Sequence, residues 1–261
     1  MNDRSIAAAV AKWRSSLAIP DKPDEWESKG LLRRLGIAVP RGVLIQPGKS
    51  LPPAGEVSVL GTPGHCVVKV CSGEILHKTE REAVIVDVAE KQLPAAVARL
   101  QKAFPAAAIL VEEMVRHRGS EIIIGALYDP TFGPAVMAGA GGILTELYKD
   151  AAFRLAPCSP VEARHLLEEL ILYPTLRGYR GLSADVQSLA EIISKVAELA
   201  VHLIQPECQL DINPIVWSRE RWVALDVKIV LAQTRPELMP GAGTRASTAA
   251  PLPARSQLRR R

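Results

Sequence analysis

Aromatic residues are scarce in this sequence of 261 residues, because Phe, Trp and Tyr together make up 4% of it. Single-stranded nucleic acids stack their bases on aromatic side chains, so this scarcity argues against a single-strand binder. The four cysteines include no C-x-x-C pair and have no histidine at zinc-site spacing. We therefore expect neither a disulfide framework nor a structural zinc site.

Long apolar runs are also missing. The most apolar candidate, 121–130, contains charge and ends in proline well before the roughly 18 residues that a membrane span needs. The opening segment Met1-Asn-Asp-Arg-Ser5 has no apolar core of signal-peptide length. With 48% hydrophobic and 23% charged residues, the composition is that of a globular protein that we expect in the cytoplasm, without a membrane.

The formal charge of +4 is concentrated at one end of the chain. Residues 234–261 carry six arginines and one acid, a net charge of +5, whereas residues 1–233 carry 26 basic and 27 acidic side chains, a net charge of −1. The folded part thus has no electrostatic reason to bind a nucleic acid. The composition of 234–261, rich in Pro, Gly, Ala, Ser, Thr and Arg, predicts a disordered basic tail.

Apolar periodicity predicts an α+β fold with mainly antiparallel sheets. Helices are expected at 5–18, 25–35, 93–104, 160–172 and 188–204. Strands are expected at 66–70, 83–88, 108–114, 121–128, 134–140, 209–217 and 222–231, and the Pro- and Gly-rich segment 47–64 is a loop with at most one short strand, 56–60.

Lys69 lies in the middle of an apolar strand candidate, Cys66–Val70. A buried ammonium is costly unless it is paired, so two interpretations remain open. Strand alternation allows Lys69 to face solvent, and its chemistry also suits a phosphate ligand.

Asp211 and Asn213 are two residues apart on a predicted strand, so their side chains share a face. A short hairpin can place Asp226 opposite them. Two carboxylates and an amide oxygen form the hard-oxygen set that Mg²⁺ with nucleotide phosphates prefers, although an exposed polar sheet face has the same pattern.

Two loops hold further candidates. The cluster Gly139-Ala-Gly141-Gly142 would let backbone amides approach a phosphate, and a turn without a ligand is equally compatible. His77 lies beside Lys78 on a polar loop, where a solvated histidine and a nucleophile that accepts a phosphoryl group are both possible.

Taken in order, the segments of the chain resemble the ATP-grasp (beta) subunit of ADP-forming acyl-CoA synthetases, the acetate–CoA ligases related to succinyl-CoA synthetase. The resemblance covers about 25–231. It rests on Glu27–Gly42, Val67-Val-Lys-Val70, Glu74-Ile-Leu-His-Lys-Thr79, Val111-Glu-Glu-Met114, Glu121–Gly125, Tyr128-Asp-Pro-Thr-Phe-Gly-Pro134, Gly139-Ala-Gly-Gly-Ile143, Lys149–Pro157, Leu176-Arg-Gly-Tyr-Arg-Gly181, Leu210-Asp-Ile-Asn-Pro214 and Ala224-Leu-Asp226.

The resemblance implies an ATP-grasp fold, in which two α+β subdomains with mainly antiparallel sheets enclose a nucleotide. Residues 1–24 are then an N-terminal helical extension, 25–233 the ATP-grasp domain and 234–261 the tail. Within the domain, approximately 43–114 form the first nucleotide-binding subdomain and 115–233 the second, which holds the Mg²⁺ site.

The resemblance also implies roles for single residues. Lys69 contacts the nucleotide phosphates, Asn213 and Asp226 bind Mg²⁺, and Asp211 lies near the phosphoryl-transfer centre. His77 matches a histidine on a mobile loop that is proposed to receive a phosphoryl group in the acetate-type members. A hinge whose backbone meets adenine comprises Glu112, Glu113, Met114 and Val115.

The implied reaction is acyl-CoA + ADP + phosphate ⇌ carboxylic acid + CoA + ATP. Because the G-x-G-x-x-G fingerprint is absent from this sequence, we expect a separate CoA-binding alpha-type subunit as partner. The sequence departs from the family after Thr79, where Glu80-Arg-Glu-Ala83 replaces Asp, an apolar residue and a Gly-Gly pair, and at Gln209, where the family has Glu. An alternative function is therefore a catalytically weakened regulatory or scaffold subunit of the same fold.

Overall fold

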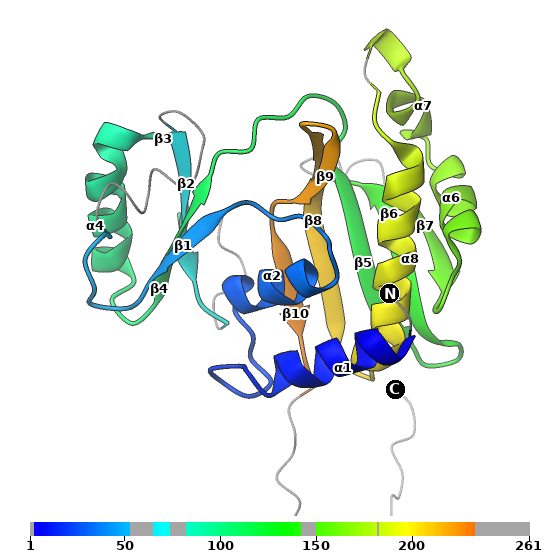
Figure 1. The fold of residues 1–261 in the computed structure, drawn as a ribbon, viewed down its shortest axis with the longest axis horizontal. Helices are drawn as coiled ribbons and strands as arrows, with labels where there is room; N and C mark the ends of the chain where they lie inside the picture. The colour runs from blue at the N-terminus through cyan, green and yellow to red at the C-terminus, as the bar shows by residue number, and fades with distance from the viewer. Residues whose placement is uncertain (1–2, 53–64, 74–81, 142–149, 182, 233–261) are drawn as a thin grey trace, which may run out of the picture.

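Two antiparallel sheets organise the chain in the computed structural model, which describes residues 3–52, 65–73, 82–141, 150–181 and 183–232 (Figure 1). The smaller sheet has four strands in the order β1-β4-β2-β3. The larger has six, in the order β10-β8-β5-β6-β7, with β9 also paired to β8. The predicted α+β class and its antiparallel sheets are confirmed.

The smaller sheet comprises β1 (Gly42–Ile45), β2 (His65–Cys71), β3 (Val84–Ala89) and β4 (Ala108–Glu113). The larger comprises β5 (Ile122–Asp129), β6 (Gly133–Ala140), β7 (Ala151–Leu155), β8 (Gln209–Ser218), β9 (Arg221–Ala224) and β10 (Val227–Val230). The helices are α1 (Asp3–Arg14), α2 (Glu25–Arg34), α4 (Leu93–Ala103), α6 (Pro160–Glu168), α7 (Tyr173–Leu176) and α8 (Val186–Leu203), with short 3₁₀ turns η1 (Glu90–Gln92) and η3 (Tyr179–Gly181).

Helix α4 covers one face of the smaller sheet. Val68 and Val70 of β2 and Ile109 and Val111 of β4 form a buried cluster with the apolar side of this helix. Since side chains alternate along a strand, Lys69 and Glu112 project from the opposite face. This alternation directs charge toward the second half of the molecule.

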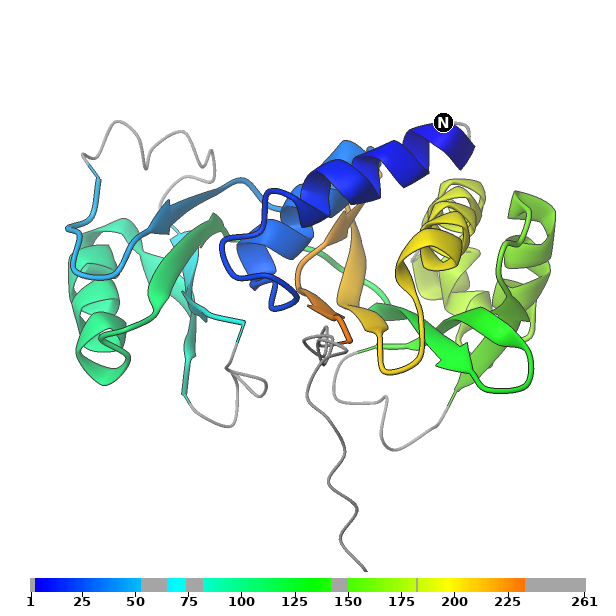
Figure 2. The ribbon, with the colours of Figure 1, turned by 90° about the horizontal axis from the view of Figure 1, so that it is seen from below.

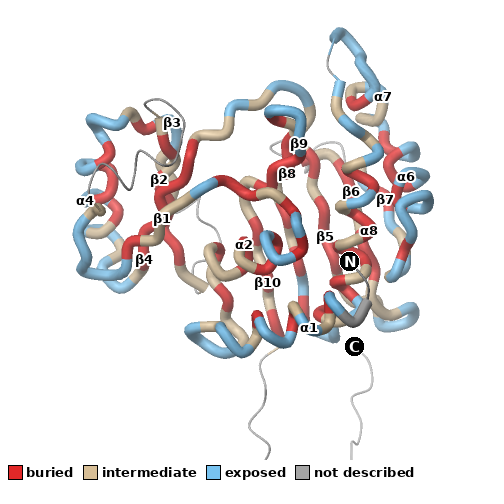
Figure 3. The backbone as a smooth tube through the Cα atoms, viewed as in Figure 1, coloured by how far each residue is buried: buried red, intermediate tan, exposed pale blue. Residues whose placement is uncertain are grey.

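The larger sheet has its apolar face against α6 and α8. Leu210 and Ile212 of β8 lie in the main core together with residues of these helices and of α1. Figure 3 shows the buried residues concentrated along the strands and on the inner sides of the helices. Asp211 and Asn213 alternate with the buried residues and therefore lie on the other face of β8.

Helix α2 lies between the two sheets (Figures 1 and 2). It begins with a capping box in which the Asp24 side chain accepts from Glu27 N and the Glu27 side chain accepts from Asp24 N. Trp26 packs against Leu110 of the smaller sheet, and α2 also contacts β10 of the larger one. The capping box thus fixes the start of the helix that joins the two halves.

Two strands were not expected from the sequence. β1 precedes the segment 47–64, and β7 lies after the glycine cluster. β7, with the sequence Ala-Ala-Phe-Arg-Leu, has no β-branched residue and pairs with β6 along one edge, so its sequence carries little strand signal. The possible strand 56–60 lies outside the described residues.

The helix expected over 5–18 ends at Arg14, and two further predicted elements were too long. The strand expected over 222–231 is interrupted at Leu225–Asp226, where Leu225 N donates to Pro214 O and Asn213 N donates to Asp226 O. The helix expected over 160–172 ends at Glu168, because the Asp150 carboxylate accepts hydrogen bonds from Ile171 N and Leu172 N. In both places a tertiary contact overrides a local pattern.

Among the described helices, none combines the length and apolarity needed to cross a membrane. The predicted tail 234–261 lies outside the described residues.

Candidate functional site

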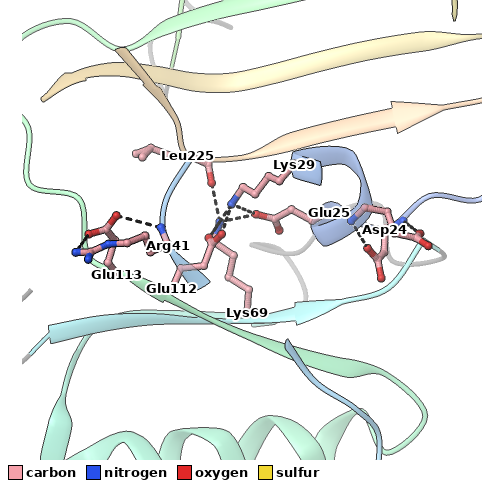
Figure 4. A network of polar contacts seen from close by, with 9 residues as sticks. Asp24, Glu25, Lys29, Arg41, Lys69, Glu112, Glu113 and Leu225 are labelled. Carbon is pink, nitrogen blue, oxygen red and sulfur yellow. Dashed lines mark hydrogen bonds and ion pairs between the residues drawn. The ribbon is translucent and has the colours of Figure 1, made fainter. Parts of the chain in front are cut away.

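Lys69 is buried at the junction of the two sheets, with 7% of its surface exposed. The interpretation in which it faces solvent is therefore wrong. Its ammonium projects from the face of β2 opposite α4, toward α2 and the Leu225–Asp226 interruption of the larger sheet (Figure 4). The burial of an ammonium requires anionic partners, and the structure supplies two of them.

Those partners belong to a cluster of four charged residues, Glu25, Lys29, Lys69 and Glu112, which we call the junction network (Figure 4). Lys69 Nζ lies 2.8 Å from Glu25 Oε1 and 3.1 Å from Glu112 Oε2, and it donates to Leu225 O at 2.9 Å. Lys29 Nζ lies 2.7 Å from Glu25 Oε1 and 2.6 and 2.7 Å from the two Glu112 oxygens. Two ammoniums thus balance two carboxylates.

The junction network keeps Lys69 charged. Desolvation by burial lowers the pKa of Lys69, but the carboxylates of Glu25, Glu112 and Asp226 together outweigh it, so that this pKa lies well above its ordinary value. Asp226 belongs to the larger sheet, so the field at Lys69 comes from both halves of the molecule. A permanent cation at such a junction can bind a phosphate.

The second candidate group lies on the open face of the larger sheet. Asp211 and Asn213 share this face of β8, and Asn213 N donates to the backbone oxygen of Asp226 at 3.1 Å. The predicted placement of Asp226 beside the other two is thus confirmed, although the connection is an interrupted strand rather than a continuous one. We call Asp211, Asn213 and Asp226 the acidic face.

Asp211 has the features of a cation ligand. Its Oδ1 atom is buried and accepts no hydrogen bond from the described residues. Burial raises the pKa of Asp211, as does the neighbouring carboxylate of Asp226, while Lys228 lowers it in part. This carboxylate oxygen has no hydrogen-bond donor among the described residues and lies beside a second carboxylate and an amide. Such a set of oxygens suits a hard divalent cation such as Mg²⁺. Within the described ranges, no group of three or more His, Cys, Asp or Glu residues is placed to hold a metal ion.

Lys228 is a charged residue that the sequence reasoning missed. It lies on β10 directly opposite Asp211 in the strand register and is partly buried. Lys228 pairs with Asp211 across two antiparallel strands, so the two side chains lie on the same face of the sheet. This relation can be stated only when the strand register is known. The acidic face therefore has a lysine at its edge.

The predicted hinge, 112–115, includes the last two residues of β4, and its glutamate side chains are engaged. Glu112 belongs to the junction network, and the Glu113 carboxylate accepts from Arg41 N and Arg41 Nη2, both at 3.0 Å. The backbone nitrogens of Glu113 and Met114 donate to the carbonyls of Arg41 and His65. Val115 lines a shallow pocket with Glu113, Ser218, Arg219, Arg221 and Val223. The role of this backbone toward adenine stays a prediction.

Gly141 directly follows β6 and lies in close contact with the start of β5. Its nitrogen donates to Glu121 O at 2.8 Å, and a Cβ atom at this position would lie 2.9 Å from the carbonyl carbon of Ile122. The backbone packing therefore requires glycine here, whether or not a phosphate is bound. Gly142 and His77 lie outside the described residues, so their predicted roles remain predictions.

Glu25 and Lys29 are the main members of the site that the sequence did not indicate. They stand at i and i+4 on α2, the spacing of an ordinary exposed ion pair. Their burial, at 4% and 0% exposure, depends on the two sheets that enclose the helix. The available signal is their position on the same helix face as the apolar residue Leu32.

The chain is similar to known proteins in sequence and in structure. A family model described as an ATP-grasp domain matches residues 21–231. The beta subunit of acetate–CoA ligase (ADP-forming) I from Pyrococcus furiosus is 34% identical over 218 residues, covering 79% of this chain and 90% of that subunit. The beta subunit of ligase II from the same organism is 33% identical over 219 residues, with the same coverage of 79% and 90%.

A solved structure extends this similarity to three dimensions. Dinucleotide forming acetyl-coenzyme A synthetase 1 from Ca. Korarchaeum cryptofilum, in complex with coenzyme A and Mg-AMPPCP, aligns with a TM-score of 0.68 at 28% identity. The alignment covers 88% of this chain and 100% of that one. The similarity therefore includes both sheets and the junction between them.

Proposed function

The chain belongs to the ATP-grasp family and, within it, to the beta subunits of ADP-forming acetate–CoA ligases, and from that premise we propose that it binds ATP or ADP with Mg²⁺ for such a ligase. The complete reaction is acyl-CoA + ADP + phosphate ⇌ carboxylic acid + CoA + ATP. A phosphoryl group passes between nucleotide and acid through a primary phosphohistidine on a partner subunit, and His77 is the candidate in this chain for a second histidine that accepts it.

One observation carries the proposal, namely the hydrogen bond of 2.9 Å from Lys69 Nζ to Leu225 O. Leu225 directly precedes Asp226, so this bond brings a cation of the smaller sheet next to the acidic face of the larger sheet. Phosphoryl transfer depends on positioning and charge neutralisation, and it needs a cation and a metal site on adjoining elements. This placement supports a nucleotide whose phosphates lie between the junction network and the acidic face.

The proposed roles follow the chemistry of the side chains. Lys69 donates to phosphate oxygens, while Asn213 and Asp226 bind Mg²⁺, which neutralises phosphate charge when bound. Asp211 lies beside them near the transferred group. The regions 43–114 and 115–233 form two subdomains around the nucleotide, with adenine against the backbone of 112–115 and phosphates near Gly141 and Gly142.

The proposal includes a partner. Relatives that are named beta subunits imply an alpha-type subunit, and we propose that such a subunit supplies the CoA site and the primary phosphohistidine. The present chain then exchanges a phosphoryl group between its nucleotide and that subunit.

Titration calorimetry of the purified chain with Mg·ADP and Mg·ATP tests nucleotide binding. We expect saturable binding that is lost in Lys69→Met and weakened in Asp226→Asn, since these variants remove a phosphate donor and a metal ligand. The exposed Arg34→Met variant is the control, with unchanged affinity. Absence of wild-type binding at millimolar nucleotide would refute the proposal.

A second candidate function, a nucleotide-binding regulatory subunit, is favoured by one observation. Glu82 occupies a position where the family has glycine, and its φ of 52° lies in the left-handed region that favours glycine. Its carboxylate pairs with Arg99 Nη2 at 2.9 Å on the protein surface. Release of acid from acyl-CoA, with ADP, phosphate and an alpha-type subunit supplied, separates the two candidates. Activity that is lost in His77→Ala identifies the ligase, and a complex that binds nucleotide without turnover identifies the regulatory subunit.

A further inference from the structure

Lys29 is the most enclosed charged residue of the junction network. Its side chain is fully buried, while that of Lys69 retains 9% exposure. All three of its short contacts are to carboxylate oxygens, and two of them engage both oxygens of Glu112. Lys29 therefore has no direct access to a ligand, and any effect on the nucleotide must pass through its neighbours.

The distances show how Lys29 acts on Lys69. Glu112 lies 2.6 and 2.7 Å from Lys29 Nζ but 3.1 Å from Lys69 Nζ, so Lys29 is its closer partner. Glu25 Oε1 is shared between the two ammoniums at 2.7 and 2.8 Å. Without Lys29, Lys69 would be the sole ammonium of the network beside two buried carboxylates, and these would compete with an incoming phosphate.

We propose that Lys29 is a positioning residue for nucleotide binding: by neutralising Glu25 and Glu112, it leaves Lys69 able to exchange a carboxylate partner for a nucleotide phosphate. This inference rests on the proposed function, because it takes Lys69 as the phosphate donor. Glu25 is the competing partner in the nucleotide-free protein. Lys29 and Glu25 thus affect nucleotide affinity in opposite directions, although both stabilise the same network.

The test compares variants of the full chain by titration calorimetry with Mg·ADP. Lys29→Met is expected to raise the dissociation constant by about tenfold or more, the scale of one hydrogen bond to a charged group. Glu25→Gln removes a competing carboxylate, so its dissociation constant stays equal to that of the wild type or decreases. The double variant Lys29→Met/Glu112→Gln restores one carboxylate to one ammonium, and its affinity returns toward the wild-type value.

A purely structural role would give a different pattern. Equal losses of affinity in Lys29→Met, Glu25→Gln and the double variant would overturn the proposal, as would a Lys29→Met dissociation constant within twofold of the wild type. If Lys29→Met does not fold, the dissociation constants of Glu25→Gln and of the charge-balanced double variant decide. Values near that of the wild type in both support the proposal, and equal losses of affinity in both overturn it. Loss of binding in the wild type itself would instead refute the proposed function. The exposed Arg34→Met change on the same helix is the matched control, with unchanged affinity.

Discussion

The junction network and the acidic face are two groups of charges about the same contact between the sheets, yet they differ in how their charges are balanced. In the network, each of the two ammoniums lies within 3.1 Å of both carboxylates, and all four residues are buried. On the acidic face, Asp211 Oδ1 accepts no hydrogen bond from the described residues, and its carboxylate is repelled by that of Asp226.

The charges of the junction network are balanced within the protein, whereas those of the acidic face can be balanced by a bound cation. A paired and buried network resists the loss of any member, because the remaining charges stay in a medium of low polarity. Two close carboxylates destabilise the ligand-free fold, and the binding of a cation raises its stability. The same chain thus carries a charge-balanced network at the smaller sheet and, at the larger one, an anionic face with a carboxylate oxygen that accepts no hydrogen bond from the described residues.

The largest effect is expected for Glu112→Ala. Because Lys29 and Lys69 would both remain buried with only Glu25 between them, the free energy of unfolding should fall by about 3–5 kcal/mol. Urea denaturation measures this loss. The control is Glu169→Ala, since Glu169 pairs with Arg154 on the surface, where a much smaller loss is expected because solvent screens the pair. Similar losses in the two variants would contradict a buried network.

A smaller effect of opposite sign is expected for Asp211→Asn. The pKa of Asp211 is raised in the folded protein, so the contribution of this carboxyl to stability is present below its ordinary pKa of about 3.9 and is lost as the pH rises through the raised value. The variant escapes this loss. It should therefore unfold at a higher temperature than the wild type at neutral pH, and the difference should vanish at acid pH.

Added Mg²⁺ provides a further test of the acidic face. Millimolar Mg²⁺ with ADP should raise the melting temperature of the wild type more than that of Asp211→Asn, because the variant lacks one of the two carboxylates whose repulsion a bound cation relieves. A variant that is less stable than the wild type at neutral pH, without metal, would show that Asp211 is balanced in the same way as the junction network.

The smallest effect is expected outside both regions, at Glu82. Glu82→Gly relieves the left-handed backbone conformation at φ 52° and should stabilise the fold by about 1 kcal/mol. The exposed pair with Arg99 that is lost contributes little. Guanidinium denaturation provides the measurement, with Glu82→Ala, which loses the ion pair but keeps the strain, as the control. A stabilisation shared by both variants would contradict a backbone origin.

The sequence was informative where chemistry and alternation coincide. Both halves of the candidate site are indicated by the sequence, one by Lys69 within an apolar strand and the other by the Asp211-x-Asn213 spacing. Strand alternation puts residues with this spacing on one face. Glu25 and Lys29 were not found, since burial of an i, i+4 pair depends on which elements enclose the helix. The solvent-facing alternative for Lys69 was wrong for the same reason.

The interrupted strand was also beyond local reasoning. The mainly apolar segment 222–231 predicted one strand, but the backbone bonds at Leu225 and Asp226 divide it into β9 and β10. That interruption presents the Leu225 carbonyl to Lys69. The contact that joins the two halves of the site thus arises where the sequence-based prediction failed.

The most direct test of the account is a crystal structure of the chain with Mg·AMPPCP. We expect phosphate oxygens within about 3 Å of Lys69 Nζ and the metal ion bound by Asn213 and Asp226 beside Asp211. A structure in which Lys69 keeps all its contacts to Glu25, Glu112 and Leu225, while the nucleotide or its metal lies away from β8, would contradict it.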